Sequence, residues 1–390
     1  MSNSISSYLN PYIVGNALEA LAGTTALLAN TNKDMSTAAA SKGDTVTMGV
    51  PTALTAASVT AANTAPAPSD ITIGKRSIQL SNEYKTSFAL TGKETQDYEL
   101  SSVVAQQIRA AVQGMAYKVN ATLWEKYYQI PYAVGNSGTG FFASNANGLS
   151  DMDKVLTDNF CPIQDRKFVA GTKDYAALVN LTEVHYQNQF GGNVAQTGIV
   201  GDVRGFEVNR DQQVPTHTVG SITDDPDVTA LTAAGSTSIG ITCDAGDAVA
   251  LKKGDLIEFG DGYSYSVQAD VTIGNSATGT ITLDRGLEVA VAEDAALALA
   301  TTTSTFDANS ILAIGGRMDG YSVVGRLPEV APMGYQTQGE HMPIIDPVSG
   351  FPFMISIYPQ YKQVALEVSA IWGVEVTDSR KLCRALTYSS

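Results

Sequence analysis

The sequence predicts an α+β fold with an inserted all-β, barrel-like domain, and three observations predict it. Strands with period-two alternation flank one long helical pattern, and an acidic, β-patterned block interrupts the second half of the chain. That block, Ser221–Thr305, carries thirteen Asp and Glu against three basic residues. Its charge of −10 leaves only −5 of the chain's −15 for the other residues. An acidic module within a nearly neutral chain indicates architecture rather than chemistry.

Composition excludes several classes of protein. The 390 residues allow two or three cores, and a pI near 4.6 argues against non-specific nucleic-acid binding by the whole surface. Cys161, Cys243 and Cys383 are scattered and lack CxxC spacing, so we expect no disulfide framework, no thiolate metal site and a reducing cytoplasm. Met1–Asn30 has no signal-peptide pattern, and no apolar run is long enough to span a membrane.

The N-terminal third predicts an arm followed by a hairpin. Asn10–Leu28 has helical spacing broken by glycines, which favours a short helix in a mostly extended arm. Gly43–Pro51 and Asp70–Thr91 alternate as strands, and the uncharged Thr52–Ser69 joins them. We therefore expect an extended hairpin that is too slender to bury a core and needs a partner surface.

A long helix is predicted next. Thr91 and Glu94 match a capping box, and apolar residues follow at spacings of three and four: Leu100, Val104, Ile108, Ala111, Met115, Val119 and Leu123. This is about 30 residues, or about 45 Å of helix. Because it has one apolar face, we expect it to lie across a sheet. Pro131–Gly148 is predicted to be a loop.

The remaining elements are mixed. Arg166–Gly220 predicts a helix over Lys173–Gln189, and Gly198–Val208 predicts a turn, a strand, a glycine turn and a second strand. Within the acidic block we expect strands near Ser238–Thr242, Leu256–Phe259, Tyr263–Ala269 and Gly279–Leu283. The last predicted strands are Ser310–Ile314, Tyr321–Arg326, Phe353–Tyr358 and Gln363–Val376. Short strands at this spacing suggest a small barrel or sandwich in the acidic block.

No catalytic, cofactor or metal site is predicted, and we expect the chain not to be an enzyme. His185, His217 and His341 are isolated, which favours ordinary histidines over metal ligands. The run Asp224–Asp227 lacks the order of a calcium loop and is more typical of a solvated linker. Gly191–Gly205 has no phosphate-loop motif, so its glycines favour tight turns, and no GxSxG or HExxH motif occurs.

Four charged residues are candidates for contacts between subunits. Lys75, Arg76, Glu83 and Lys85 stand on the predicted returning arm of the hairpin. A solvated strand face and intersubunit salt bridges explain them equally well. An isolated exposed pair contributes only about 0–1 kcal/mol, but repetition in a closed lattice would still fix the register.

The order of these elements resembles that of the major capsid protein of tailed bacteriophages, a fold that herpesvirus capsids share. Ala29–Pro51 is similar to the start of the extended loop in the podovirus coat-protein branch, and Ser77–Glu94 to its return strand. Gly201–Gly220 resembles the segment after which that branch carries an inserted β-barrel domain. Ile345–Leu386 resembles its C-terminal strand.

The resemblance implies a division of the chain into family domains. We expect an N-terminal arm (1–42), an extended loop (43–91), a spine helix with a peripheral, P-type domain (92–165), an axial, A-type domain (166–220 and 306–352), an inserted acidic β domain (221–305) and C-terminal strands of the peripheral domain (353–390).

It also implies the function of a structural virion protein. The chain would self-assemble into the hexamers and pentamers of an icosahedral shell, in the host cytoplasm, and would remain in the virion capsid. Its partners would be a separate scaffolding protein, because no long heptad-rich extension occurs, a portal protein, and packaged double-stranded DNA bound without sequence specificity. No membrane and no cofactor are implied.

Two other functions stay open. An encapsulin-like compartment uses the same fold to enclose cargo enzymes, although it disfavours an insert of this kind. A carbohydrate-binding surface or tail-fibre protein is suggested by the Thr-, Ala- and Gly-rich β content, whereas the missing signal peptide and the long helix argue against it.

Overall fold

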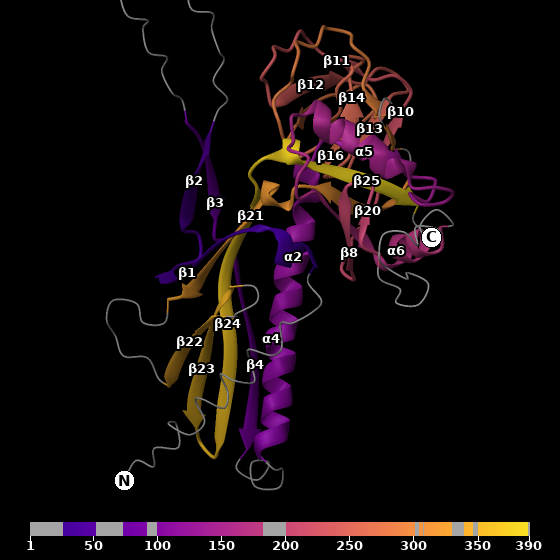
Figure 1. The fold of residues 1–390 in the computed structure, drawn as a ribbon. Helices are drawn as coiled ribbons and strands as arrows, with labels where there is room; N and C mark the ends of the chain where they lie inside the picture. Colours follow the sequence, from indigo (N-terminus) through magenta and orange to yellow (C-terminus); the bar gives the residue numbers. More distant parts are fainter. Residues whose placement is uncertain are drawn as a thin grey trace, which may run out of the picture.

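The computed structural model describes residues 26–51, 73–91, 100–181, 200–300, 304–306, 308–329, 339–345 and 350–388. Two large sheets, one long helix and a β-rich insert make up this part of the chain (Figure 1). We call Ser221–Thr305 the insert and the remaining described residues the body. None of the described helices is long and apolar enough to span a membrane.

The first sheet has six strands. They are β1 (Asn32–Ala40), β4 (Asn82–Thr91), β21 (Tyr321–Pro328), β22 (Glu340–Ile345), β23 (Pro352–Gln360) and β24 (Gln363–Val376). The long strand β24 pairs with β4 along one edge, and with β23 and then β21 along the other. All pairings are antiparallel except that of β1 with β21. The predicted strands Phe353–Tyr358 and Gln363–Val376 are thus confirmed.

Helix α4 (Leu100–Trp124) covers one face of this sheet. Met115, Val119 and Leu123 pack on alternate residues of β24, including Trp372, whose indole Nε1 donates to Thr122 Oγ1 at 2.9 Å. The short helix α2 (Ala26–Asn30) packs beside α4. The predicted helix is confirmed from Leu100 onward. However, Thr91 ends strand β4, and Glu94 lies outside the described residues.

Strands β2 (Thr45–Pro51) and β3 (Ile73–Gln79) form a separate antiparallel pair that rises away from the first sheet (Figure 1). Ile78 and Leu80 pack on Ile371 and Val324 at its base. The strand expected over Asp70–Thr91 is corrected, because the chain leaves β3 at Leu80 and enters β4 of the first sheet. A close approach holds this junction: a Cβ on Gly373 would lie 2.4 Å from the Gln79 carbonyl oxygen.

The second sheet has eight strands. They are β5 (Ala133–Asn136), β6 (Lys167–Gly171), β7 (Asp202–Val203), β8 (Phe206–Asp211), β9 (Thr216–His217), β19 (Ser304–Thr305), β20 (Ser310–Gly316) and β25 (Leu382–Tyr388). Helices α5 (Asn147–Asp158) and α6 (Thr172–Val179) pack on one face through Leu149, Met152 and Leu178. The helix predicted over Lys173–Gln189 is corrected, because it ends at Val179.

The chain crosses between the two large sheets three times, first from β4 to β5 with α4 between them. The short helix η3 (Met318–Gly320) joins β20 to β21, and η5 (Ser379–Lys381) joins β24 to β25. Strand β25 was not predicted. Together with β5 and α5 it lies in the layer of the second sheet, although the sequence analysis assigned their residues to the peripheral domain.

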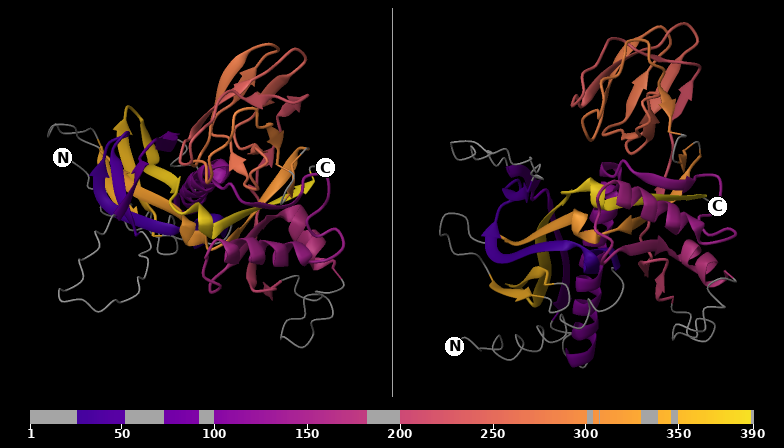
Figure 2. Two further views of the ribbon diagram at one scale, coloured as in Figure 1. Left: turned by 90° about the horizontal axis from the view of Figure 1, so that it is seen from above. Right: turned by 45° about the horizontal axis from the view of Figure 1, so that its top comes forward.

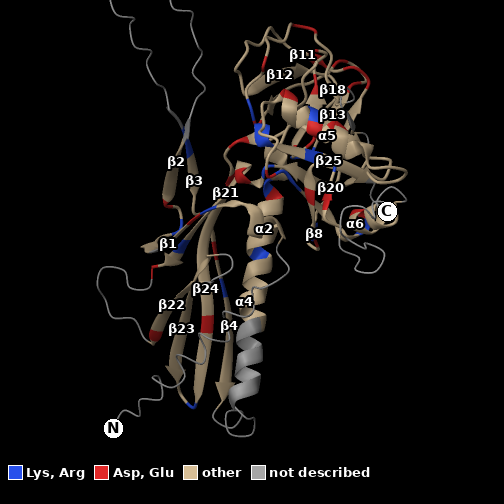
Figure 3. Cartoon of the chain, viewed as in Figure 1, with Lys and Arg blue, Asp and Glu red and all other residues tan. Residues whose placement is uncertain are grey.

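The insert contains three small sheets. The first is β10 (Ser221–Thr223), β13 (Ala248–Leu251) and β16 (Val271–Ile273); the second is β11 (Asp227–Val228), β12 (Ser238–Thr242) and β17 (Thr278–Thr282); the third is β14 (Leu256–Glu258), β15 (Tyr265–Ser266) and β18 (Ala298–Leu299). Ile239, Ile241, Val249 and Ile281 belong to a buried cluster made of insert residues. The insert stands out from the body (Figure 2), and Asp and Glu residues are spread along its loops and strands (Figure 3).

The separate cluster leads to a prediction for the insert. Ser221–Thr305 expressed alone should fold cooperatively, with a stability of about a few kcal/mol because the core is small. Carboxylate repulsion should destabilise it at low salt near neutral pH, and added salt should restore it. Urea titrations followed by amide NMR at two salt concentrations check this. Random-coil amide shifts in every buffer would show that the insert needs the body to fold.

Candidate functional site

The four predicted contact residues lie in two different sheets. Lys75 and Arg76 are exposed on β3, opposite Gly49 and Met48 of β2. Glu83 and Lys85 lie on β4 in the six-stranded sheet, so placing them on the hairpin arm was wrong. The predicted contact role would therefore be divided between two residues of the hairpin and two of the body.

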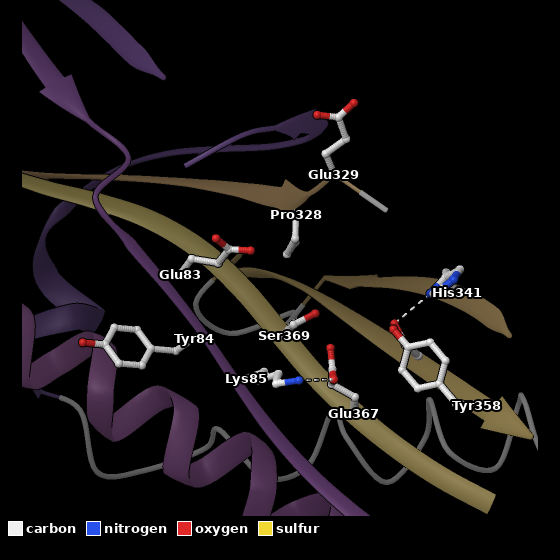
Figure 4. A pocket seen from close by; sticks show the side chains of 10 residues that line it. Glu83, Tyr84, Lys85, Pro328, Glu329, His341, Tyr358, Glu367 and Ser369 are labelled. Atoms are coloured by element: carbon white, nitrogen blue, oxygen red, sulfur yellow. Dashed lines mark hydrogen bonds and ion pairs between the residues drawn. The ribbon is translucent and has the colours of Figure 1, made fainter. Parts of the chain in front are cut away.

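Glu83 and Lys85 line a groove on the six-stranded sheet. Its volume is about 700 Å³, and it is lined by Glu83, Tyr84, Lys85, Pro328, Glu329, His341, Ser356, Tyr358, Glu367 and Ser369 (Figure 4). Glu367 and Ser369 alternate along β24 with the residues that pack on α4, so they point away from the helix. The sheet thus has one face buried under α4 and one face that is hollowed and polar.

Charges in this groove are mostly negative. The carboxylates of Glu83, Glu329 and Glu367 stand against one cation, Lys85, whose Nζ lies 3.2 Å from Glu367 Oε2. The Lys85 side chain is 67% exposed, so this intrachain pair contributes little to stability and leaves Lys85 accessible. An open, acidic, hydrogen-bonding face of this kind suits a basic partner surface.

The groove contains one hydrogen-bonded pair of a histidine and a serine. His341 Nδ1 lies 2.8 Å from Ser356 Oγ, and Ser356 is only 2% exposed. No group of three His, Cys, Asp or Glu is placed to hold a metal ion within the described ranges. Cys161, Cys243 and Cys383 are buried free thiols, and His185 lies outside the described residues.

Arg384 joins the insert to the body. It is 0% exposed, and its Nε donates to the Ile130 carbonyl at 2.5 Å, its Nη1 to the Gly254 carbonyl at 2.7 Å and its Nη2 to Ser266 Oγ at 3.1 Å. The Ser266 hydroxyl in turn donates to the Tyr128 carbonyl. Burial lowers the pKa of Arg384 to about 10. This value is still well above neutral pH, so the guanidinium stays charged. One side chain of β25 therefore ties the segment after α4 to the turn at Gly254 and to Ser266 of β15, both in the insert.

A second buried network lies beside Arg384. His217 of β9 is 2% exposed, and its Nε2 lies 2.7 Å from Asp255 Oδ1. Its Nδ1 lies 2.6 Å from the hydroxyl of Tyr127, in the short helix η1 (Glu125–Gln129). Asp255 also accepts from the amides of Gly220 at 3.1 Å and Lys252 at 2.7 Å. The isolated histidine expected from sequence is a structural histidine at the junction.

Cations of the insert also lie on tyrosine rings of the body. Lys253 Nζ is 3.8 Å from the ring centroid of Tyr128, and the Arg285 guanidinium is 4.8 Å from that of Tyr132. Arg285 Nη1 also donates to the Tyr132 hydroxyl at 2.7 Å. These cation–π contacts, at about 0.5–2 kcal/mol each, add to the junction.

The junction contains one carboxyl group, that of Asp284, whose pKa is raised. Burial raises the pKa of Asp284 to about 6, and the nearby negative charge of Glu375 adds to the rise. Glu375 is held by Lys126 Nζ at 2.8 Å and by Gln129 Nε2 at 2.5 Å. Ionised Asp284 is therefore a cost to the folded chain near neutral pH.

The sequence analysis missed Arg384, although a signal existed. In Leu382–Tyr388 the alternation places Arg384 in register with Leu382 and Leu386, which are both buried. Reading the segment as a strand would have put the arginine on a buried face, where it needs backbone carbonyls as partners.

Comparisons with known proteins give fold similarities at low identity. No protein-family model and no curated protein matches the chain. The capsid structure of cyanophage P-SCSP1u is similar, at 12% identity over 95% of this chain and 90% of that chain, with a TM-score of 0.49. The mature capsid of bacteriophage PhiM1 is similar at 10% identity over 93% of this chain and 87% of that chain, with a TM-score of 0.47. A virus-like particle from Pyrococcus furiosus is similar at 8% identity over 96% of this chain and 97% of that chain, with a TM-score of 0.41.

We predict that Arg384→Met destabilises the chain by about 3–5 kcal/mol, because it leaves buried carbonyl groups and a buried hydroxyl without a donor. Urea unfolding of the purified variant measures this. Arg380→Ala is the matched control, since Arg380 pairs with Asp378 at the surface and should change stability by less than about 0.5 kcal/mol. Equal unfolding midpoints for the two variants would contradict the role of Arg384.

Asp284→Asn should stabilise the chain at pH 8 by about 1–3 kcal/mol. The pKa of Asp284 is higher in the folded chain than in the unfolded one, so its stabilising contribution is complete below pH 4 and is lost as pH rises through about 6. The variant should lack that pH dependence, as urea midpoints from pH 4 to pH 8 will test. Asp270→Asn is the control, because hydrogen bonding to the Lys253 amide lowers the pKa of Asp270 and gives the opposite sign. An unchanged pH profile for Asp284→Asn would refute this assignment.

Proposed function

We propose that the chain is the major capsid protein of a tailed bacteriophage and self-assembles into an icosahedral shell that encloses double-stranded DNA. The observation that carries the proposal is the β2–β3 hairpin. It forms a two-stranded sheet, and among the described residues its apolar cluster with the body is confined to its base, at Val46, Met48, Ile78 and Leu80. An isolated two-stranded ribbon is marginally stable in water, so the hairpin needs a surface on another subunit.

The groove on the six-stranded sheet supplies a surface of suitable charge. Lys75 and Arg76 on the hairpin are cationic, whereas Glu83, Glu329 and Glu367 make the groove acidic. We infer that the hairpin of one copy lies over this polar face of a neighbour. Charges of opposite sign would steer the approach and fix the register, even though each exposed pair contributes little.

A contact between the hairpin of one copy and the groove of the next is heterologous. Such contacts form a ring when successive rotations between copies add up to a full turn. In this proposal the six-stranded sheet with α4 is the peripheral domain, and the eight-stranded sheet with α5 and α6 is the axial domain at the centres of hexamers and pentamers. The insert faces outward, because its charge of −10 is unfavourable beside DNA phosphates and is screened by water and salt outside. A separate scaffolding protein and a portal protein complete the assembly in the host cytoplasm.

Shortening the loop 52–69 to a two-residue turn should abolish closed particles while circular dichroism of the subunit stays unchanged. The shortened hairpin keeps its base on Ile371 but loses reach toward a neighbour. Electron microscopy and sedimentation of the wild-type and shortened chains, each with the scaffolding protein, measure this. Normal closed particles from the shortened chain would show that the hairpin is not an intersubunit element.

The contents of wild-type particles separate the proposal from its nearest alternative. DNA in mature particles supports a phage capsid, whereas a single protein cargo would indicate an encapsulin-like compartment. A chain that stays a 41.0 kDa monomer under all conditions, including with the scaffolding protein, would rule out both shells.

A further inference from the structure

The loop after α5 presents two large apolar side chains to solvent. Phe160 is 94% exposed and Ile163 is 69% exposed. Few large apolar side chains of the described residues are this accessible, and these two lie three positions apart in one short loop. Because both side chains are exposed, they contribute little apolar burial to the fold of the subunit.

Phe160 also occupies a backbone position that favours glycine. Helix α5 ends in a Schellman motif, in which the Cys161 amide donates to the Leu156 carbonyl at 2.9 Å and the Phe160 amide to that of Thr157 at 3.0 Å. Phe160 is the left-handed residue of this motif, with a φ of 59°. Glycine adopts that conformation without a steric penalty, and a bulky side chain does not. Phenylalanine is therefore unfavourable here on two grounds, its backbone and its exposure.

A buried arginine holds the loop rigid. Arg166 is 2% exposed, and its guanidinium donates to the carbonyls of Pro162 at 3.0 Å and Cys161 at 2.6 Å. It also pairs with Asp153 in α5. Arg166 therefore holds the backbone of the loop in place, so little backbone entropy is lost when a partner buries Phe160 and Ile163.

We propose that Phe160 and Ile163 form a contact knob that inserts into an apolar site on a neighbouring copy of this chain. A phenylalanine buries about 150–250 Å². With Ile163 the knob stays well below the roughly 1,200 Å² of total area that a stable specific interface needs. It thus works as part of a larger interface, which a copy of this chain supplies through the hairpin and the groove. The exposed carboxylates of Asp158 and Asp165 beside the knob would repel the phosphates of a nucleic acid, which favours a protein partner.

The inference rests on the proposed shell, and Phe160→Gly tests it. The variant should have a urea midpoint equal to or above that of the wild-type subunit, because glycine relieves the left-handed backbone. Its assembly, followed by light scattering with the scaffolding protein, should be at least tenfold slower. Asp165→Gly is the matched control: its φ is 61° in the same loop, and it removes no apolar side chain, so it should assemble as the wild type does.

Labelling distinguishes a neighbouring copy from any other partner. The chain's own cysteines are buried, so a maleimide should label Phe160→Cys selectively in the free subunit. When this variant is mixed into wild-type particles as a minor component, the label should be excluded from residue 160. Full labelling in the particle, or normal assembly of Phe160→Gly, overturns the inference while the shell stands. A wild-type chain that forms no particles overturns the shell and the knob together.

Discussion

The arrangement of insert and body depends on the hydrogen bonds of the buried Arg384 guanidinium. Desolvating a guanidinium is costly, and the cost is offset only because carbonyls from the body and the insert converge on it at 2.5 and 2.7 Å. The buried pair of His217 and Asp255 and the stacked cations Lys253 and Arg285 surround it. The insert is therefore attached by directional polar contacts and by a small apolar cluster in which Leu256 and Ala300 of the insert pack with body residues such as Leu386, while its larger apolar core is made of insert residues.

The insert buries its own apolar core, whereas several described surfaces of the body are open to solvent. One face of the six-stranded sheet is buried under α4, and the other is an open polar groove. The β2–β3 hairpin extends beyond its base, and the loop at Phe160 exposes an apolar side chain at a strained position. Each of these features is unfavourable or neutral in a single subunit, and in the proposed shell each would be stabilised by the neighbour that covers it. This asymmetry is the physical basis of the proposed shell.

Much of the fold could be predicted from sequence because its signals are local. Period-two alternation predicted β2 and β24, and three-four spacing predicted the face of α4 that carries Met115 and Val119. The break at Leu80 was missed, since the alternation continues across it and only the pairing partner changes from β2 to β24. The roles of Arg384 and His217 depend on residues more than 35 positions away, such as Asp255, which no local pattern reveals.

Hydrogen–deuterium exchange of the free subunit and the assembled particle tests the central claim most directly. We expect amides of β2, β3 and the loop at Phe160 to gain protection on assembly, because a neighbour covers them in the proposed shell. Amides in the insert core around Ile239 and Ile281 should exchange equally slowly in both states, because that core is formed within the subunit. Unchanged exchange in the hairpin and the Phe160 loop, with protection gained in the insert core, would contradict the account.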